Sequence, residues 1–413
     1  MNGGNKSLPM QGDLEGLGLF FELLQIAIGN RKELTRQLSD DEWASLYSEC
    51  EKHALLGIAF AGVEKLPKEQ YPPFDVLAEW VHDAQVAKER NKKATDICEK
   101  VCRQIEKDGF WVCVLKGQAN LPNYPEYLRN SRTCGDIDIW IWPLNLGKTC
   151  GITDIINYSV KKSLDVKNIR PSVRYNNTEL PGIWPIDVEI HHRPSFMNCF
   201  YRNARLQRWC KDNIGDSINI ELDGKNIPVA KNSFNAIYQL SHIYCHLFDE
   251  GIGLRQILDY YFVLQTLSVP LHRGKISPPQ SPCVGGEDRE NRLEVREECL
   301  KQIERLGMKK FASAMMYVLQ TVFAMPDEYL ICKPDEKEGK FLLNEIIQAG
   351  NFGKYDERIK RVEGSYLKVQ CNHAFEKWKH NLRLITHYPE EVLWEPLFRL
   401  YHFVWRKFRL WKF

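Results

Sequence analysis

The sequence lacks an excess of charge of either sign, and it lacks a hydrophobic run long enough to cross a membrane. Its 413 residues contain 56 Lys and Arg against 54 Asp and Glu, which gives a net charge of +2. This near-neutral total argues against a general binder of nucleic acid, whose whole surface would be basic. The most apolar early stretch, residues 17–28, is short and contains Glu22, so we expect no membrane-spanning helix.

A secretory signal, internal repeats and low-complexity tracts are also missing. The first lysine is followed by Ser-Leu-Pro-Met and then by acidic residues, unlike the apolar segment of a signal peptide. The 13 cysteines are an odd number at irregular spacings. Such usage favours reduced thiols over a disulfide framework. Together these features predict a soluble, cytoplasmic protein.

Hydrophobic periodicity divides the chain into three regions and predicts an α+β fold. Residues 1–104 are predicted to be an N-terminal helical region, residues 105–230 mix strands with helices, and residues 231–413 form a C-terminal helical region. We therefore expect a small mixed β-sheet core with helical regions on both sides. A Pro- and Gly-rich stretch at residues 268–291 predicts a loop within the last region.

Three runs in the central region predict strands. Residues 110–115 form a continuous apolar run, which is typical of a buried strand. Isoleucines alternate with other residues over 136–141 and again over 184–192, as in strands that have one polar face. Between the strands, residues 118–129 and 146–163 are predicted to be helices.

The pair Asp136 and Asp138 carries the strongest chemical signal. Two aspartates at positions i and i+2 of a strand project from the same face and therefore lie close together. Such like charges are costly unless a cation lies between them, so the pair predicts a divalent metal site. Carboxylate oxygens favour Mg²⁺ or Mn²⁺ over zinc. A third carboxylate on a neighbouring strand would complete the site, and Asp187 is offered by the second alternating strand.

Residues near the aspartate pair are suited to binding a polyphosphate. Gly117 follows a predicted strand and permits close approach of the backbone to a phosphate. Lys116, Arg129 and Arg132 could neutralise phosphate oxygens. The alternative is an ordinary solvated strand, but the Lys-Gly pair, the basic segment and the later acidic strand favour the metal site.

With these features the chain resembles a nucleotidyltransferase family of the DNA polymerase beta-like superfamily. The resemblance is carried by Leu-Lys-Gly at 115–117, Tyr-Pro at 124–125, Arg132 and Gly-Asp-Ile-Asp at 135–138. It extends over most of the chain, including residues 241–259 and a turn at 350–353. It implies a nucleotidyltransferase core that moves a nucleoside monophosphate from an NTP to a hydroxyl acceptor, which would be a small molecule, a sugar phosphate or a protein.

The resemblance also implies which residues hold the metal. By this similarity Asp136 and Asp138 bind Mg²⁺ (or Mn²⁺), and Asp187 matches the third acidic position. Such families often have a histidine two residues after that position, where this chain has Glu189. Glu189 could take part in metal binding, or it could accept a hydrogen bond from His191 or Arg193.

The helices after residue 231 offer two further candidate sites. His242 and His246 are one turn apart, a spacing that can bind zinc with Cys245 nearby. No fourth ligand is evident, which favours histidines that pack or hydrogen-bond near the cleft. Arg255 and Asp259 are also one turn apart and are predicted to form an ion pair. This is either a structural pair or one in which Arg255 contacts the nucleotide or the acceptor.

The C-terminal segment is basic and aromatic. Residues 398–413 contain five basic side chains and no acidic one, next to one apolar helical stripe: Leu397, Leu400, Tyr401, Val404, Trp405, Phe408 and Trp411. We expect this stripe to pack on the core. The alternative is a peripheral contact with an anionic membrane. The second functional hypothesis is accordingly a non-catalytic interaction protein that retains the nucleotidyltransferase fold and is membrane-peripheral through this helix.

Overall fold

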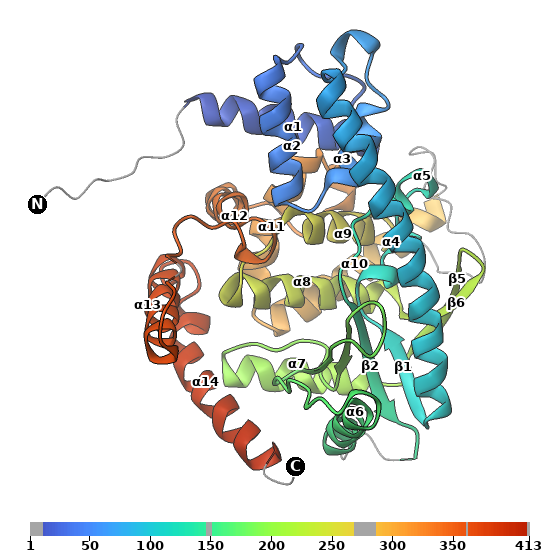
Figure 1. Ribbon diagram of the computed structural model, residues 1–413, viewed down its shortest axis with the longest axis vertical. Coiled ribbons are helices and arrows are strands. Elements are labelled where there is room, and N and C mark those ends of the chain that lie inside the picture. The colour runs from blue at the N-terminus through green and yellow to red at the C-terminus, as the bar shows by residue number, and fades with distance from the viewer. Residues whose placement is uncertain (1–10, 146–150, 268–285, 361, 411–413) are drawn as a thin grey trace, which may run out of the picture.

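The computed structural model describes residues 11–145, 151–267, 286–360 and 362–410 (Figure 1). It confirms the predicted α+β class, because helices from both ends of the chain flank a six-stranded mixed sheet. The strand order is β3-β4-β2-β1-β6-β5. The strands are β1 (Phe110–Val114), β2 (Ile137–Pro143), β3 (Asn177–Leu180), β4 (Val188–His191), β5 (Ser217–Leu222) and β6 (Lys225–Ala230).

The register of the central strands decides which polar residues meet. β1 pairs antiparallel with β2 and parallel with β6, whereas β2 pairs parallel with β4. In the β2–β4 pair, Asp138 lies directly opposite Glu189. Directly paired residues of neighbouring strands project from the same face. The pairing therefore brings these two carboxylates together on one side of the sheet.

Different helices cover the two faces of the sheet. Helices α4 (Phe74–Lys107) and α6 (Gly151–Lys167) pack on the face that carries the isoleucines of β2. Helices α7 (Phe200–Asp212) and α8 (Asn232–Asp249) contribute to the core on the opposite face, where Trp140 stacks on Phe234. Asp138 projects from this second face, where Tyr238 of α8 lies near it.

The remaining helices form the flanks. A continuous apolar core joins the N-terminal helices to those that follow α8, and α1 packs against α11 (Figure 1). The N-terminal helices are α1 (Gln11–Ile28), α2 (Asp40–Lys52) and α3 (Leu56–Val63). The later helices are α9 (Leu254–Gln265), α10 (Gly286–Arg305), α11 (Lys309–Phe323), α12 (Glu336–Ala349), α13 (Tyr366–Leu384) and α14 (Pro389–Leu410). None of the described helices combines the length and the apolarity needed to cross a bilayer.

The segment between β1 and β2 differs from its prediction. The helix expected over 118–129 is wrong: the chain forms the 3₁₀ turns η2 (Gly117–Ala119) and η3 (Leu121–Asn123) and the short helix α5 (Glu126–Arg129). Prolines 122 and 125 are the cause, because proline lacks the N–H that a helix interior needs. In the stretch expected to be a loop, α10 begins at Gly286, and residues 268–285 lie outside the described residues. The region boundaries at 104 and 230 stay predictions.

Candidate metal centre and its cavity

Three side chains from β2 and β4 lie close enough together to hold a metal ion. Asp138, Glu189 and His191 each offer a ligand atom, and these atoms lie within 4.8 Å of one another. The side chain of Asp138 is fully buried, and its Oδ2 atom has no hydrogen-bond partner among the described residues. A buried carboxylate oxygen without a donor is costly. Its position in a cluster of oxygen ligands therefore fits a bound divalent cation.

Lys116 places a positive charge beside these carboxylates. Because β1 runs antiparallel to β2, Lys116, two residues after the end of β1, comes to lie next to the start of β2. The Nζ atom of Lys116 is 3.2 Å from Oδ1 of Asp138 and 3.8 Å from Oδ2 of Asp136. Burial disfavours the charged amine, but the surrounding carboxylates outweigh it and raise the pKa of Lys116.

Protons within the cluster balance its negative charge. Nε2 of His191 lies 2.9 Å from Oδ1 of Asp138, and Nδ1 lies 3.2 Å from the backbone carbonyl of Arg193. Both ring nitrogens thus face acceptors, as in the doubly protonated ring. Burial favours the neutral ring, but hydrogen bonds to Asp138 and Glu189 raise the pKa of His191 to about 9. Burial, together with the charge of Asp136, raises the pKa of Asp138 to about 6.

The structure separates the two candidates for the third carboxylate. Asp187 precedes β4, its backbone carbonyl accepts a hydrogen bond from Ile137, and its side chain is exposed. Glu189 lies in the cluster and accepts a hydrogen bond from Asn177. Although burial opposes ionisation, its hydrogen bond with His191 lowers the pKa of Glu189. The sequence signal that could have identified Glu189 is the histidine two residues after it.

The predicted phosphate-binding residues lie on the segment between β1 and β2. Gly117 has a φ of +61°, in the left-handed region that glycine adopts readily. Arg129 donates from Nε to the carbonyl of Tyr124 at 3.1 Å. Arg132 is buried and forms a bidentate pair with Asp259, with Nε–Oδ1 and Nη2–Oδ2 distances of 2.7 and 2.6 Å. Most of the guanidinium of Arg132 is thus committed to a carboxylate of α9.

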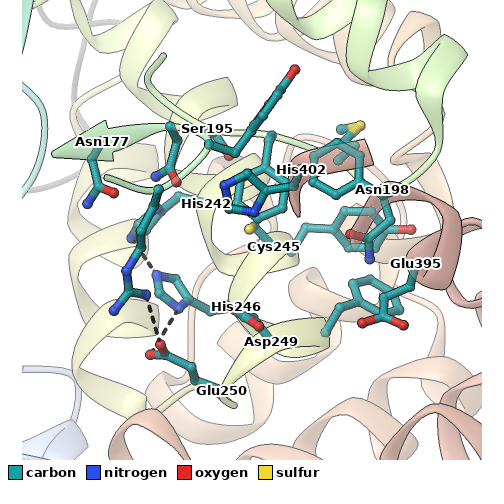
Figure 2. Close-up of a pocket in the computed structure, with 18 of the residues that line it drawn as sticks. Asn177, Ser195, Asn198, His242, Cys245, His246, Asp249, Glu250, Glu395 and His402 are labelled. Carbon is teal, nitrogen blue, oxygen red and sulfur yellow. Dashed lines mark hydrogen bonds and ion pairs between the residues drawn. The ribbon is translucent and has the colours of Figure 1, made fainter. Parts of the chain in front are cut away.

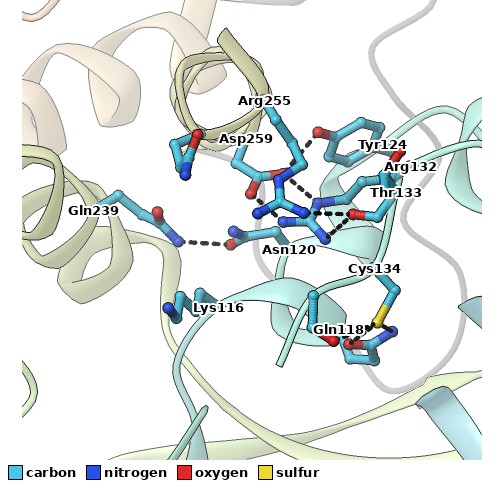
Figure 3. A network of polar contacts seen from close by, with 12 residues as sticks. Lys116, Gln118, Asn120, Tyr124, Arg132, Thr133, Cys134, Gln239, Arg255 and Asp259 are labelled. Carbon is cyan, nitrogen blue, oxygen red and sulfur yellow. Dashed lines mark hydrogen bonds and ion pairs between the residues drawn. The ribbon is translucent and has the colours of Figure 1, made fainter. Parts of the chain in front are cut away.

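Side chains of helix α9 hold the segment that leads into Asp136 through hydrogen bonds and an ion pair, which we call the clamp of α9 (Figure 3). Tyr124 donates to Oδ1 of Asp259 at 2.7 Å, and Nη1 of Arg255 donates to the carbonyl of Thr133 at 3.0 Å. The ion pair expected between Arg255 and Asp259 is wrong: within the described part of the chain, the carboxylate pairs with Arg132 instead. Sequence spacing alone cannot detect this competitor, which is 127 residues away.

Arg255 retains an unused donor. Its Nε atom is buried and has no hydrogen-bond partner among the residues that the structure describes. Burial and the neighbouring charge of Arg132 lower the pKa of Arg255. A buried guanidinium that lacks a full set of acceptors is a suitable partner for an anionic ligand.

Buried amides hold the same segment in place. Asn91 of α4 donates to the carbonyls of Arg129 and Arg132 at 2.9 and 3.1 Å. Gln118 donates to Oδ1 of Asn91 at 2.8 Å. Hydrogen bonds of this kind fix the backbone ahead of Asp136, so the segment is organised before any ligand binds.

A cavity of about 370 Å³ opens at the ligand cluster (Figure 2). Lys116, Asp136, Glu189 and His191 line one end of it, whereas Gly117, Arg129, Arg132, Asp187 and Arg255 are not among its described lining residues. The wall facing the cluster comes from α8 and α14 and from the residue that follows α8. It includes His242, His246, Asp249, Glu250, Glu395 and His402. No motif in the sequence indicates that α14 reaches this cavity.

The two histidines of α8 face the cavity as a pair. Their Nε2 atoms are 3.1 Å apart, so one ring donates and the other accepts. Burial lowers the pKa of His242 well below its usual value and lowers that of His246 to about 4. Among the described residues, the group of three close metal ligands is the Asp138 cluster, and it does not include these histidines. They therefore line the cavity as neutral hydrogen-bonding groups.

Comparison with known proteins gives one match. A family model described as "Uncharacterised nucleotidyltransferase" matches residues 39–277, which is more than half of the 413 residues. No curated protein and no solved structure matches the chain. The matched segment contains the whole sheet and the ligand cluster, whereas α13 and α14 follow it.

Proposed function

The chain belongs to the uncharacterised nucleotidyltransferase family, and we propose that it transfers a nucleoside monophosphate from an NTP to a hydroxyl group of an acceptor bound in the cavity. The observation that carries this proposal is the cluster of Asp138, Glu189 and His191 at one end of that cavity. In the reaction the acceptor oxygen attacks the α-phosphorus. The bond from this phosphorus to the bridging oxygen breaks, and pyrophosphate leaves.

Mg²⁺ or Mn²⁺ is the cofactor that the donor atoms favour. Asp138 and Glu189 of the cluster would hold it, together with Asp136, which lies outside the cluster but lines the same end of the cavity. Carboxylate oxygens are the preferred ligands of both ions. We place Glu189 in the role first given to Asp187, because Asp187 is exposed and lies outside the cluster. The ion supplies neutralisation of the triphosphate and a lower pKa for the acceptor hydroxyl when it is bound.

The chain itself supplies the binding and positioning groups. Lys116 faces both the cavity and the carboxylates, so its ammonium can exchange a carboxylate partner for a phosphate oxygen of the NTP. Gly117, with its left-handed backbone, and Arg255, with its buried and unpartnered Nε, stay proposed nucleotide contacts, although neither is among the described residues that line the cavity. Arg129 stays a proposed nucleotide contact. Arg132 acts as a positioning residue, because Asp259 already occupies its guanidinium.

The position of Glu189 suits it to receive the proton of the acceptor hydroxyl. Glu189 lines the cavity, whereas Asp138 is fully buried behind it. A general base must come within hydrogen-bond distance of the proton that it removes. Of the two paired carboxylates, Glu189 is therefore the one that an acceptor in the cavity can reach.

The test compares three amide variants of similar size. Melting temperatures of wild type, Asp138→Asn, Glu189→Gln and Asp187→Asn are measured with each NTP in the presence of Mg²⁺ or Mn²⁺. A ligand at 100 times its Kd stabilises the folded state by about 2.7 kcal/mol. We expect wild type and Asp187→Asn to show this shift, and Asp138→Asn and Glu189→Gln to lose it.

Two outcomes would contradict the proposal. The first is that no NTP raises the melting temperature of wild type in a metal-dependent way, which would mean that the protein does not bind an NTP with metal. The second is loss of the shift in Asp187→Asn with retention in Glu189→Gln, which would restore Asp187 as the third carboxylate. Release of pyrophosphate on addition of hydroxylated acceptors then measures the transfer itself.

A further inference from the structure

Helix α14 packs on the rest of the chain through one face only. Phe398 is buried on this face, where its ring stacks on Phe196 at 5.2 Å between ring centroids and meets the edge of Tyr175 at 4.9 Å. Val392 is buried as well, and Glu395 and His402 of the same face line the cavity. A helix at the surface of a protein needs only one such packed face.

A second apolar stripe of α14 remains exposed. Leu393, Leu397, Leu400, Val404 and Phe408 follow one another at spacings of three and four residues, and they are between 42% and 78% exposed. Leu397, Leu400, Val404 and Phe408 are among the residues that the sequence analysis expects to be docked, and for them the expectation is wrong. Tyr401 and Trp405 of the same prediction do contact the ring of Tyr175, and Trp411 lies outside the described residues. The packed face and the apolar stripe are two different sides of the helix, and the stripe has no partner within the described residues.

Helix α13 adds further exposed apolar and aromatic side chains. They are Tyr366, Leu367, Phe375, Trp378 and Leu382. Both helices lie at the left edge of the molecule in the view of Figure 1. An exposed apolar surface of this extent is characteristic of an interaction site. Tyrosine and tryptophan in particular are enriched where an apolar phase meets water.

The exposed charged side chains of α13 and α14 favour an anionic partner. Lys368, Arg399, Arg406 and Lys407 are exposed. Of the acidic residues of α13 and α14, Glu376, Glu391 and Glu395 are buried, whereas the side chain of Glu390 is 46% exposed and pairs with Arg202. Arg399 pairs with Glu395, so Lys368, Arg406 and Lys407 give the two helices a net positive exposed charge next to the apolar stripe.

From these observations we propose that the outer faces of α13 and α14 form a docking surface for an anionic lipid bilayer. Exposed leucines and aromatic rings enter the boundary between headgroups and acyl chains, while the lysines and arginines contact lipid phosphates. A second copy of the chain fits this surface less well, since two positive faces would repel each other. No described helix crosses the bilayer, so the contact is peripheral. The proposal is independent of the catalytic one.

The experiment measures co-sedimentation of the full chain with vesicles. One set of vesicles contains phosphatidylcholine alone, and the other contains phosphatidylcholine with phosphatidylserine. We expect binding to the second set only, with a loss of binding as the salt concentration rises. Replacing Arg406 or Lys407 by Gln should weaken binding about fivefold each, because a basic residue near an anionic surface contributes that much. The control Lys340→Gln removes an exposed cation of α12 and should leave binding unchanged.

The apolar contribution is tested with Leu400→Ser and Phe408→Ser, whose side chains are exposed in the free protein. Both variants should melt at the wild-type temperature and keep the metal-dependent nucleotide shift of wild type, but bind the anionic vesicles more weakly. Equal binding to both vesicle sets, or no binding, would overturn the proposal. A dimer in light scattering that Phe408→Ser dissociates would instead assign the surface to a second copy.

Discussion

Replacement of Asp259 by Asn should destabilise the protein more than any other isosteric change at the clamp of α9. The side chain of Asp259 is 3% exposed and accepts hydrogen bonds from Arg132 and Tyr124. Arg255 lies in the same buried region, where the charge of Arg132 already lowers its pKa. Asp259→Asn therefore leaves the buried guanidinium of Arg132 without its carboxylate, in a region that already holds the charge of Arg255.

The expected magnitude follows from the burial of this pair. Removing one partner from a buried salt bridge typically costs about 3 to 5 kcal/mol, because the remaining charge is left uncompensated. Tyr124→Phe removes one hydrogen bond to Asp259 and should cost only about 1 kcal/mol. The exposed pair of Glu336 and Lys340 provides the control. Glu336→Gln should leave the free energy of unfolding unchanged, because exposed ion pairs contribute little.

Urea unfolding followed by tryptophan fluorescence measures these differences. The midpoints are compared at a common slope, so that a change in midpoint reports a change in stability. A double variant, Arg132→Met with Asp259→Leu, should be less destabilised than either of its single changes, since neither charge is then left alone. A loss below about 1 kcal/mol for Asp259→Asn would refute the assignment of the clamp to this ion pair.

Three further results are expected. Lys116→Gln should bind Mn²⁺ more tightly than wild type in titration calorimetry without nucleotide, because the ammonium that competes for the carboxylates is gone. The same variant should bind an NTP more weakly, and changes of both affinities in the same direction would contradict this prediction. Gly57→Ala should lower the free energy of unfolding by about 1 to 3 kcal/mol, since its new methyl group would lie 2.3 Å from the backbone oxygen of Ser131. Burial raises the pKa of Glu391 from 4.5 to about 7. Between these pH values the carboxyl is protonated in the folded protein but ionised in the unfolded chain. The free energy of unfolding should therefore fall by about 3 kcal/mol as the pH rises from 4.5 to 7. Glu391→Gln should remove this part of the pH dependence of unfolding, and an unchanged slope would disprove it.

The parts of the structure that depend on local periodicity could be predicted from the sequence. β1, β2 and β4 follow from apolar runs and from alternation, and the shared face of Asp136 and Asp138 follows from the period of two in a strand. Strands β3 and β6 could not be found in this way. β3 contains polar residues at buried positions, and β6 contains Pro228, which local propensity assigns to turns.

The parts that depend on pairing between distant segments could not be predicted. Asp187 and Glu189 have the same phase in the strand predicted over 184–192, and only the β2–β4 register shows that Glu189 faces Asp138. Likewise, Asp259 is near Arg255 in the sequence but pairs with Arg132. The contribution of α14 to the cavity depends on the path of the last helices, which no local pattern determines.

The ammonium of Lys116 has a consequence for the order in which ligands are taken up. Since it lies 3.2 Å from Asp138, a free divalent ion must compete with an internal charge for the same oxygens. An ion that binds as its complex with a triphosphate brings phosphate oxygens with which the ammonium of Lys116 can pair in place of the carboxylate. The protein should therefore take up metal and nucleotide as one unit, and remain folded with little bound metal when nucleotide is scarce.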